Sequence, residues 1–198
     1  MRHHRLDGLI FLHPVTLNRV GGAEQKRTRL LREILGPKAY KRIIIATTMW
    51  EDLKSEDIAT RRLEGRQAEN GIWHEMLKKG AVMVRHNNNK ESAHEIIRKV
   101  VATSDKNGKI RTLLEEELSI NEGHVGKTSA GKVVKDGIRE NLRLLREQHK
   151  ALLEDLERDQ HPPSRKEKRE KKAELRELNK KIQAKESDLR KVDTMIVS

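Results

Sequence analysis

Three short apolar runs near the start of the chain constrain its fold more than any other feature. Each run is an unbroken stretch of mostly hydrophobic residues between polar segments: Gly8–His13, Arg42–Met49 and Ala81–His86. Unbroken apolar runs of this length are typical of strands that are buried on both faces of a sheet. The first half of the chain therefore predicts three buried β-strands.

Helical patterns lie between and after these runs. Apolar residues recur at helical spacing in four stretches: Ala23–Leu35, a segment around Ile58–Leu63, Ile72–Lys79 and Lys90–Ala102. We expect the last of these helices to bury Ala93, Ile96, Ile97 and Val100. Strands that alternate with helices pair in parallel through right-handed crossovers. We therefore predict an α/β fold, a partial three-stranded parallel sheet with flanking helices, with ligands beyond the carboxyl ends of the strands.

The second half of the chain has a different period. One helical stripe runs through Val134, Ile138, Leu142, Leu145, Leu152 and Leu156, and a heptad-like seam runs through Leu175, Leu178, Ile182, Leu189, Val192 and Ile196. Lys185 interrupts the second seam, and Pro162–Pro163 separates the two patterns. This pattern predicts an α-helical hairpin or coiled coil, in which each seam pairs with the other or with a second chain. The predicted divisions are 1–104 for the α/β part, 105–132 for a helical linker and 133–198 for the basic helices.

The composition supports this division. Hydrophobic residues make up 34%, charged residues 37% and aromatic residues only 2% of the 198 positions, which cannot fill one large core, so we expect some solvated helix. The net charge of +12 favours acidic partners. Because acidic residues are interleaved with the basic ones, a solvated helical face is favoured over a nucleic-acid stripe. The chain has no cysteine, which excludes disulfides and cysteine-ligated metal sites. The apolar run near the N-terminus is too short for a signal peptide and no run is as long as a membrane span, so an intracellular, cytoplasmic protein is expected.

The stretch NEGHVGKTSAGK at Asn121–Lys132 contains G-K-T, which also ends the phosphate-binding P-loop. A P-loop requires another glycine five residues before Gly126, because two glycines let the backbone amides wrap the phosphates. That position is Asn121, and the residues before it have a helical rather than a strand pattern. We therefore predict a helix break at Gly123–Gly126 and a new helix from Thr128. No metal site is expected either, since His74–Glu75 has Lys78 where a zinc-binding helix needs a second histidine.

Four motifs together resemble the C-terminal half of a P-loop GTPase domain. They are LDGLIFLHPVTLNRVGG, IIIATTMWED, W-x-x-M-x-x-x-G-A-x-x-x-R-H-N-N and ESAHEII, with TSAG at a helix start beyond them. The likeness is strongest to the fungal G-domain proteins, which are distantly related to septins and immunity-associated GTPases, and it covers Arg5–Gly131. It implies that the phosphate loop and the magnesium-binding motifs precede the first strand. Because the chain begins at Met1, we expect the phosphate-binding half to be absent. GTP and magnesium are expected only for the intact domain.

The resemblance also implies a base-binding side. The family's N-K-x-D motif corresponds to Thr47, Thr48, Met49 and Trp50, so no carboxylate stands at the fourth place. Either Glu51 or Asp52 substitutes for it, or Trp50 covers the base. The second base-contacting loop corresponds to Asn87–Ser92. The implied set is Thr47, Thr48, Trp50, Glu51, Asp52, Asn87 and Asn88. Capping of a strand end is the alternative role for Thr47 and Thr48.

Two functions remain open at this point. The first is a GTP-binding G-domain family protein that does not hydrolyse nucleotide by itself, because the P-loop amides, lysine and metal that neutralise the phosphates are missing. The second is a non-enzymatic interaction module whose basic helices bind a protein partner, an acidic surface or a second copy. An upstream G-x-x-x-x-G-K-[ST] motif in the same reading frame would favour the first.

Overall fold

The structure, a computed structural model, describes residues 7–107, 111–158 and 165–197. The chain forms two compact units, residues 1–117 and residues 118–198. The turn predicted at Pro162–Pro163 lies outside the described residues.

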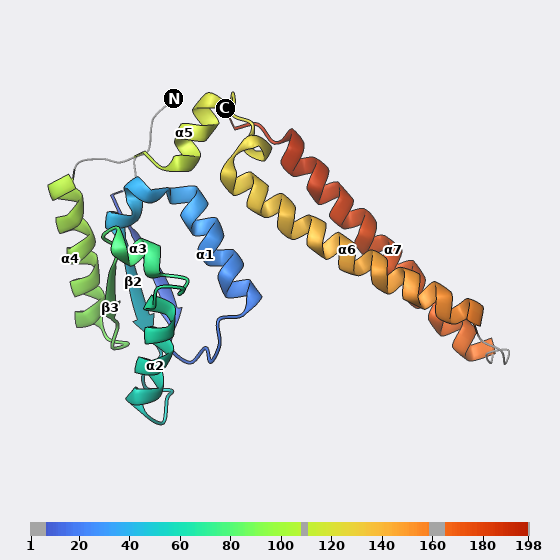
Figure 1. Ribbon diagram of the computed structural model, residues 1–198, viewed down its shortest axis with the longest axis horizontal. Coiled ribbons are helices and arrows are strands. Elements are labelled where there is room, and N and C mark those ends of the chain that lie inside the picture. Colours follow the sequence, from blue (N-terminus) through green and yellow to red (C-terminus); the bar gives the residue numbers. More distant parts are fainter. Residues whose placement is uncertain (1–6, 108–110, 159–164, 198) are drawn as a thin grey trace. The chain divides into compact units, whose positions relative to one another are not determined.

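The first unit contains one parallel sheet of three strands. These are β1 (Leu9–Pro14), β2 (Ile43–Thr48) and β3 (Val82–Arg85), in the spatial order β1-β2-β3. Leu9 lies opposite Ile43, and Ile44 lies opposite Val82. The predicted parallel sheet is thus confirmed, and within the described residues β1 forms an open edge (Figure 1).

Helices cover the two faces of this sheet unequally. The connections between strands contain α1 (Gly22–Leu35), the 3-10 helix η1 (Pro37–Arg42), α2 (Glu56–Gln67) and α3 (His74–Lys78), and α4 (Lys90–Asn107) follows β3. Figure 1 shows α4 on one side of the sheet and α1 on the other. Both crossovers pack on one face of the sheet, and among the residues that the structure describes α4 is the helix that packs on the opposite face.

The burial of β2 explains why the central strand is a continuous apolar run. Ile43 and Ile45 pack with α1, α2 and α3 in a core that includes Trp73, while Ile44 and Ala46 pack against Ile96 of α4. Both faces of β2 are therefore buried, as the sequence predicts for a central parallel strand.

The edge of the sheet departs from that pattern. Ile10 and Leu12 point to the α4 face of the sheet and are 38% and 63% exposed. The prediction that Ile97 is buried is wrong, since half of its surface is exposed. One residue advances a helix by about 100°, which turns Ile97 away from the strip of α4 that Ile96 presents to β2. The helix predicted at Ile72–Lys79 is also shorter than expected, because only His74–Lys78 is helical.

The second unit is mostly helical. The acidic helix α5 (Leu113–Ile120) leads into it, and the short 3-10 helix η2 (Val125–Lys127) precedes α6 (Ser129–Arg158) and α7 (Arg165–Thr194). Ion pairs join α6 to α7 in antiparallel order: Lys135–Asp193, Arg146–Glu186 and Asp155–Lys171. Of the two pairings left open by the sequence, the structure therefore has the one within the chain, a helical hairpin.

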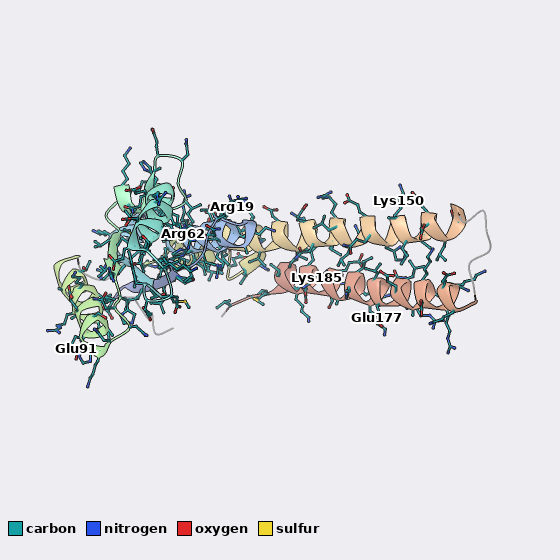
Figure 2. The ribbon with its side chains drawn as sticks, turned by 90° about the horizontal axis from the view of Figure 1, so that it is seen from below. Arg19, Arg62, Glu91, Lys150, Glu177 and Lys185 are labelled. Carbon is teal, nitrogen blue, oxygen red and sulfur yellow. The ribbon has the colours of Figure 1, made fainter. Side chains whose placement is uncertain are left out.

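The seam of the hairpin is thinly buried. Leu142 and Leu178 are 5% and 8% exposed, and most other seam residues are only half-buried. Lys185, which interrupts the predicted seam, lies between the two helices in Figure 2, and its ammonium group pairs with Asp188 at 2.9 Å. A long lysine stem can cover apolar surface in this way while its charge remains near solvent.

Candidate functional site

The carboxyl ends of β2 and β3 bring the two predicted base-contacting loops together. The backbone N–H of His86, just after β3, donates to the carbonyl oxygen of Thr47 in β2 at 2.8 Å. Met49 has a φ of 62°, a left-handed conformation that turns the chain sharply after β2. The indole Nε1–H of Trp50 then donates back to the carbonyl oxygen of Thr47 at 3.1 Å and to its hydroxyl at 3.2 Å.

Thr47 has a structural role in this arrangement. Its side chain is buried, with 1% exposed, and its hydroxyl donates to the carbonyl oxygen of Val84 at 3.2 Å. The hydroxyl thereby links β2 to β3 and also anchors Trp50. Thr48 is half-buried, and its carbonyl oxygen accepts a bond from the N–H of Val15 at 2.9 Å. Of the two roles left open for these threonines, this geometry gives Thr47 the role of a strand-end cap.

The Trp50 ring forms a stacked platform with Arg85. The guanidinium carbon of Arg85 lies 4.3 Å from the ring centroid, a cation–π geometry. Arg85 is held by two neighbours, donating from Nε to Asn87 Oδ1 at 2.8 Å and pairing through Nη1 with Glu56 at 2.8 Å. One face of the indole is therefore covered by a fixed cation. The sequence did not single out Arg85, because its role depends on the pairing of β2 with β3.

The other predicted site residues lie on the rim of this platform. Glu51, Asp52, Asn87 and Asn88 are all exposed, and Asn88 has a φ of 52°. The loop is held by Ser92, whose hydroxyl accepts a bond from the N–H of Asn87 at 3.1 Å. The structure thus brings all seven predicted residues to the carboxyl ends of β2 and β3, and six of them lie at or near the surface.

A second cluster of polar side chains lies at the carboxyl end of β1, and sequence reasoning missed it. Arg66 of α2 donates to both carboxylate oxygens of Glu24 of α1, at 2.9 and 3.2 Å. His13 Nδ1 lies 3.6 Å from the same carboxylate, and its ring meets Trp73 edge-on at a centroid distance of 4.7 Å. His13, Glu24 and Arg66 are each at most 4% exposed, and Trp73 is fully buried.

Burial dominates the electrostatics of this cluster. Burial is the main cause that lowers the pKa of His13 to about 4; the Glu24 carboxylate opposes this shift, and the nearby Arg66 contributes to it. The imidazole is therefore neutral at neutral pH. Among the described residues, His13 Nε2 and Trp73 Nε1 are buried nitrogens without a hydrogen-bond partner. A buried arginine requires an acidic partner, but no local pattern links Arg66 to Glu24, which is 42 positions away.

The G-K-T triplet has a different environment from a phosphate site. Thr128 is fully buried, its hydroxyl donates to the carbonyl oxygen of Val125 at 2.7 Å, and it accepts a bond from the N–H of Gly131 at 2.9 Å. The hydroxyl thus caps the start of α6, as expected for an N-cap threonine. The predicted helix break and restart are confirmed, since α6 begins at Ser129.

Comparison with protein-family models, curated proteins and solved structures finds no match to this chain. Among the residues that the structure describes, no group of three or more histidine, aspartate or glutamate side chains is placed to hold a metal ion. Within the same ranges, no helix is both long enough and apolar enough to span a membrane.

Proposed function

We propose that the first unit is the base-recognition side of a GTPase-like domain and that it binds guanine nucleotides through the base alone. The observation that supports this proposal is the meeting of the TTMW and HNNN loops at the carboxyl ends of β2 and β3. Open parallel sheets bind their ligands at this edge. A cytoplasmic location, where GTP is available, goes with this proposal.

Trp50 is the central residue of the proposed site. Its indole is fixed by Thr47, so the ring is already oriented before a ligand arrives. Trp50 is half-buried and packs against the core, and Arg85 covers one face of its ring, so a base must stack on the part of the indole that stays exposed or displace the guanidinium. Glu51 and Asp52 are the exposed carboxylates nearest in sequence, and a carboxylate is the group that accepts two hydrogen bonds from the guanine edge.

The affinity is expected to be weak. In a GTPase-like site most charge-assisted hydrogen bonds go to the phosphates, and each contributes about 1.5–3 kcal/mol. The 198 residues contain no G-x-x-x-x-G-K-[ST] motif to supply them. Without several of these bonds a micromolar site weakens beyond about 1 mM, since about 1.4 kcal/mol corresponds to a tenfold change. We accordingly expect neither tight GTP binding nor hydrolysis by this chain, with or without magnesium.

Nitrogen-edited NMR of the full chain tests the proposal. Trp50 and Trp73 are the only tryptophans, so two indole N–H signals are expected, and Trp50→Phe assigns them. Millimolar GDP should shift the Trp50 indole signal and the amide signals of residues 47–52 and 86–89, while ADP should shift them less. Absence of any shift with GDP, equal shifts with ADP, or shifts centred on Gly126–Thr128 would contradict a guanine site here.

The hairpin favours a second function. We propose that α6 and α7 form a module that binds another protein, either an acidic partner or a second copy. The supporting observation is that the seam between the two helices is only partly buried. Apolar side chains beside it, such as Leu144 and Leu153 of α6, are exposed. Pull-down of an added acidic protein by the full chain, in low but not high salt, tests this function.

A further inference from the structure

One side of the hairpin carries a groove between α6 and α7. Its floor contains Leu142 of α6 and Leu189 of α7. Its cationic rims contain Arg139, Arg143, Arg146 and Lys150 on α6 and Arg190 on α7. The two carboxylates that line it, Glu147 and Glu186, leave the groove with an excess of positive charge.

The cations of α6 form a regular stripe. Arg139, Arg143, Arg146 and Lys150 are separated by four, three and four residues, the spacing that places side chains on one face of a helix. This stripe extends over about 16 Å at 1.5 Å per residue. Leu153, which is 40% exposed, stands three turns beyond Leu142 and continues the apolar line beside the stripe.

We propose that this groove binds an acidic amphipathic helix of another protein, which lies along the hairpin as the third helix of a coiled coil. This inference rests on the proposed role of the hairpin as a binding module. Leucines on such a helix would pack on Leu142 and Leu189, and its flanking glutamates would meet the cationic rims, in the manner of flanking charges in coiled coils. The added leucines would complete a seam that two helices bury only in part.

Charge distribution favours such a helix over a nucleic acid. Arg143 already pairs with Glu140 and Glu147, and Arg146 pairs with Glu186, each at 2.7 Å. A uniform chain of phosphates would meet the carboxylates as well as the cations. A helix can place glutamates beside the cations alone, and its apolar face uses the leucine floor. Within the described part of the chain, the Arg190 guanidinium forms no ion pair and is exposed.

The same reasoning disfavours other occupants. A second copy would bring one basic hairpin against another, because α7 contains many more lysines and arginines than acidic residues. The acidic helix α5 of this chain is already engaged, since Glu115 accepts bonds from Thr112 and Glu116 pairs with Lys38.

Fluorescence polarisation with the full chain tests the groove. The probe is a labelled synthetic helix of about three heptads with leucine at the core positions and glutamate at the flanking positions, and its counterpart has lysine in place of glutamate. We expect the acidic peptide to bind, more weakly as salt is raised, and the lysine peptide not to bind. Arg139→Glu and Arg190→Glu should each weaken binding by about fivefold or more, because each places like charges opposite the peptide.

Lys181→Glu is the matched control. It makes the same charge reversal on α7, but Lys181 lies about two and a half turns from Arg190 and so on the opposite side of the helix. It should change the affinity by less than about twofold. Circular dichroism must show the same helix content in all three variants.

Several outcomes would overturn the inference. They are equal binding of both peptides, unchanged binding by Arg190→Glu, tighter groove-dependent binding of a duplex DNA of similar length, and dimerisation of the chain that occurs only when the peptide is added. If the acidic peptide binds but Lys181→Glu abolishes the binding, the hairpin is still a binding module and the groove is the wrong site.

Discussion

Replacing Arg66 by methionine should destabilise the first unit more than almost any other single change. The guanidinium makes two bonds to Glu24, a third to the carbonyl oxygen of Leu17 at 3.1 Å and a fourth to that of Arg62 at 2.9 Å. Methionine fills much of the same volume but leaves the Glu24 carboxylate buried without its cation. The variant therefore tests whether this ion pair holds α1, α2 and the loop after β1 together.

The size of the effect follows from burial. The two side chains are only 2% and 5% exposed, so solvent cannot replace the lost partner. Leaving one member of a buried pair unpaired costs about 3–5 kcal/mol, and a lost bond to a backbone carbonyl adds about 1 kcal/mol. Because small domains are stable by only about 5–15 kcal/mol, Arg66→Met should remove a large part of the free energy of unfolding. Glu24→Gln in the Arg66→Met background removes the stranded charge and should restore at least about 1.5 kcal/mol.

Urea unfolding followed by tryptophan fluorescence measures these values. Trp73 is a suitable probe, since it is fully buried and lies 5.9 Å from the Arg66 guanidinium and 4.7 Å from the His13 ring. The wild type, both single variants and the double variant form a double-mutant cycle. A loss below about 1 kcal/mol for Arg66→Met, or additive losses in the cycle, would refute the argument that the pair is buried and coupled.

Three further predictions concern the buried His13, two glycines of α6 and the open strand β1. The free energy of unfolding should fall as the pH is lowered from about 6.5 to about 4, and His13 should account for on the order of 3 kcal/mol of this fall. The cause is that the unfolded chain binds a proton on His13 that the buried imidazole of the folded chain does not. Urea titrations at several pH values should show a shallower fall for His13→Gln. Gly131→Ala should lower the melting temperature of the helices in circular dichroism, because a Cβ there would collide with the Val125 carbonyl oxygen, whereas Gly137→Ala in open space should raise it, since alanine favours helix by about 1 kcal/mol. We expect the chain to self-associate through the open β1 edge, because an unpaired apolar edge strand can pair with another chain. Leu12→Lys should reduce this self-association in sedimentation velocity, because a charge on an edge strand opposes such pairing; an unchanged sedimentation profile would contradict pairing at this edge.

The sheet and the hairpin could be predicted because their signals are local. The apolar run at Ile43–Thr48 has both faces buried, and the heptad spacing of α7 specifies one contact face. Gly36, with a φ of 72°, ends α1 directly before Pro37, and this positive φ suits a residue without a side chain. The local pattern could not predict which apolar residues are exposed. Ile97 has the same apolar character as Ile96, and only the position of α4 over the sheet distinguishes them.

The candidate site was predictable to a smaller extent. The order of strands and loops indicated that TTMW and HNNN lie together at the carboxyl ends of the strands. It did not indicate that the Thr47 hydroxyl bonds to the Val84 carbonyl oxygen and to the Trp50 indole. Arg85 belongs to the platform only because β3 pairs with β2 in a register that opposes it to Thr47. The Glu24–Arg66 pair depends on the packing of two crossovers that share one face. Such contacts are determined by the assembled fold rather than by spacing along the chain.

The glycines around G-K-T show that a P-loop and a closely packed helix end can require the same residue type. A P-loop has glycines because the backbone must approach phosphate oxygens closely. Here the close approach is to the chain's own C-terminal segment: the N–H of Val197 donates to the carbonyl oxygen of Gly123 at 3.0 Å, and a Cβ at Gly126 would lie 2.9 Å from the carbonyl oxygen of Val192. The threonine that would bind magnesium in a P-loop instead caps α6. Glycines at these positions therefore follow from helix-end packing alone, and substituting Thr128 by alanine should cost about 1 kcal/mol of hairpin stability without altering the NMR response to GDP.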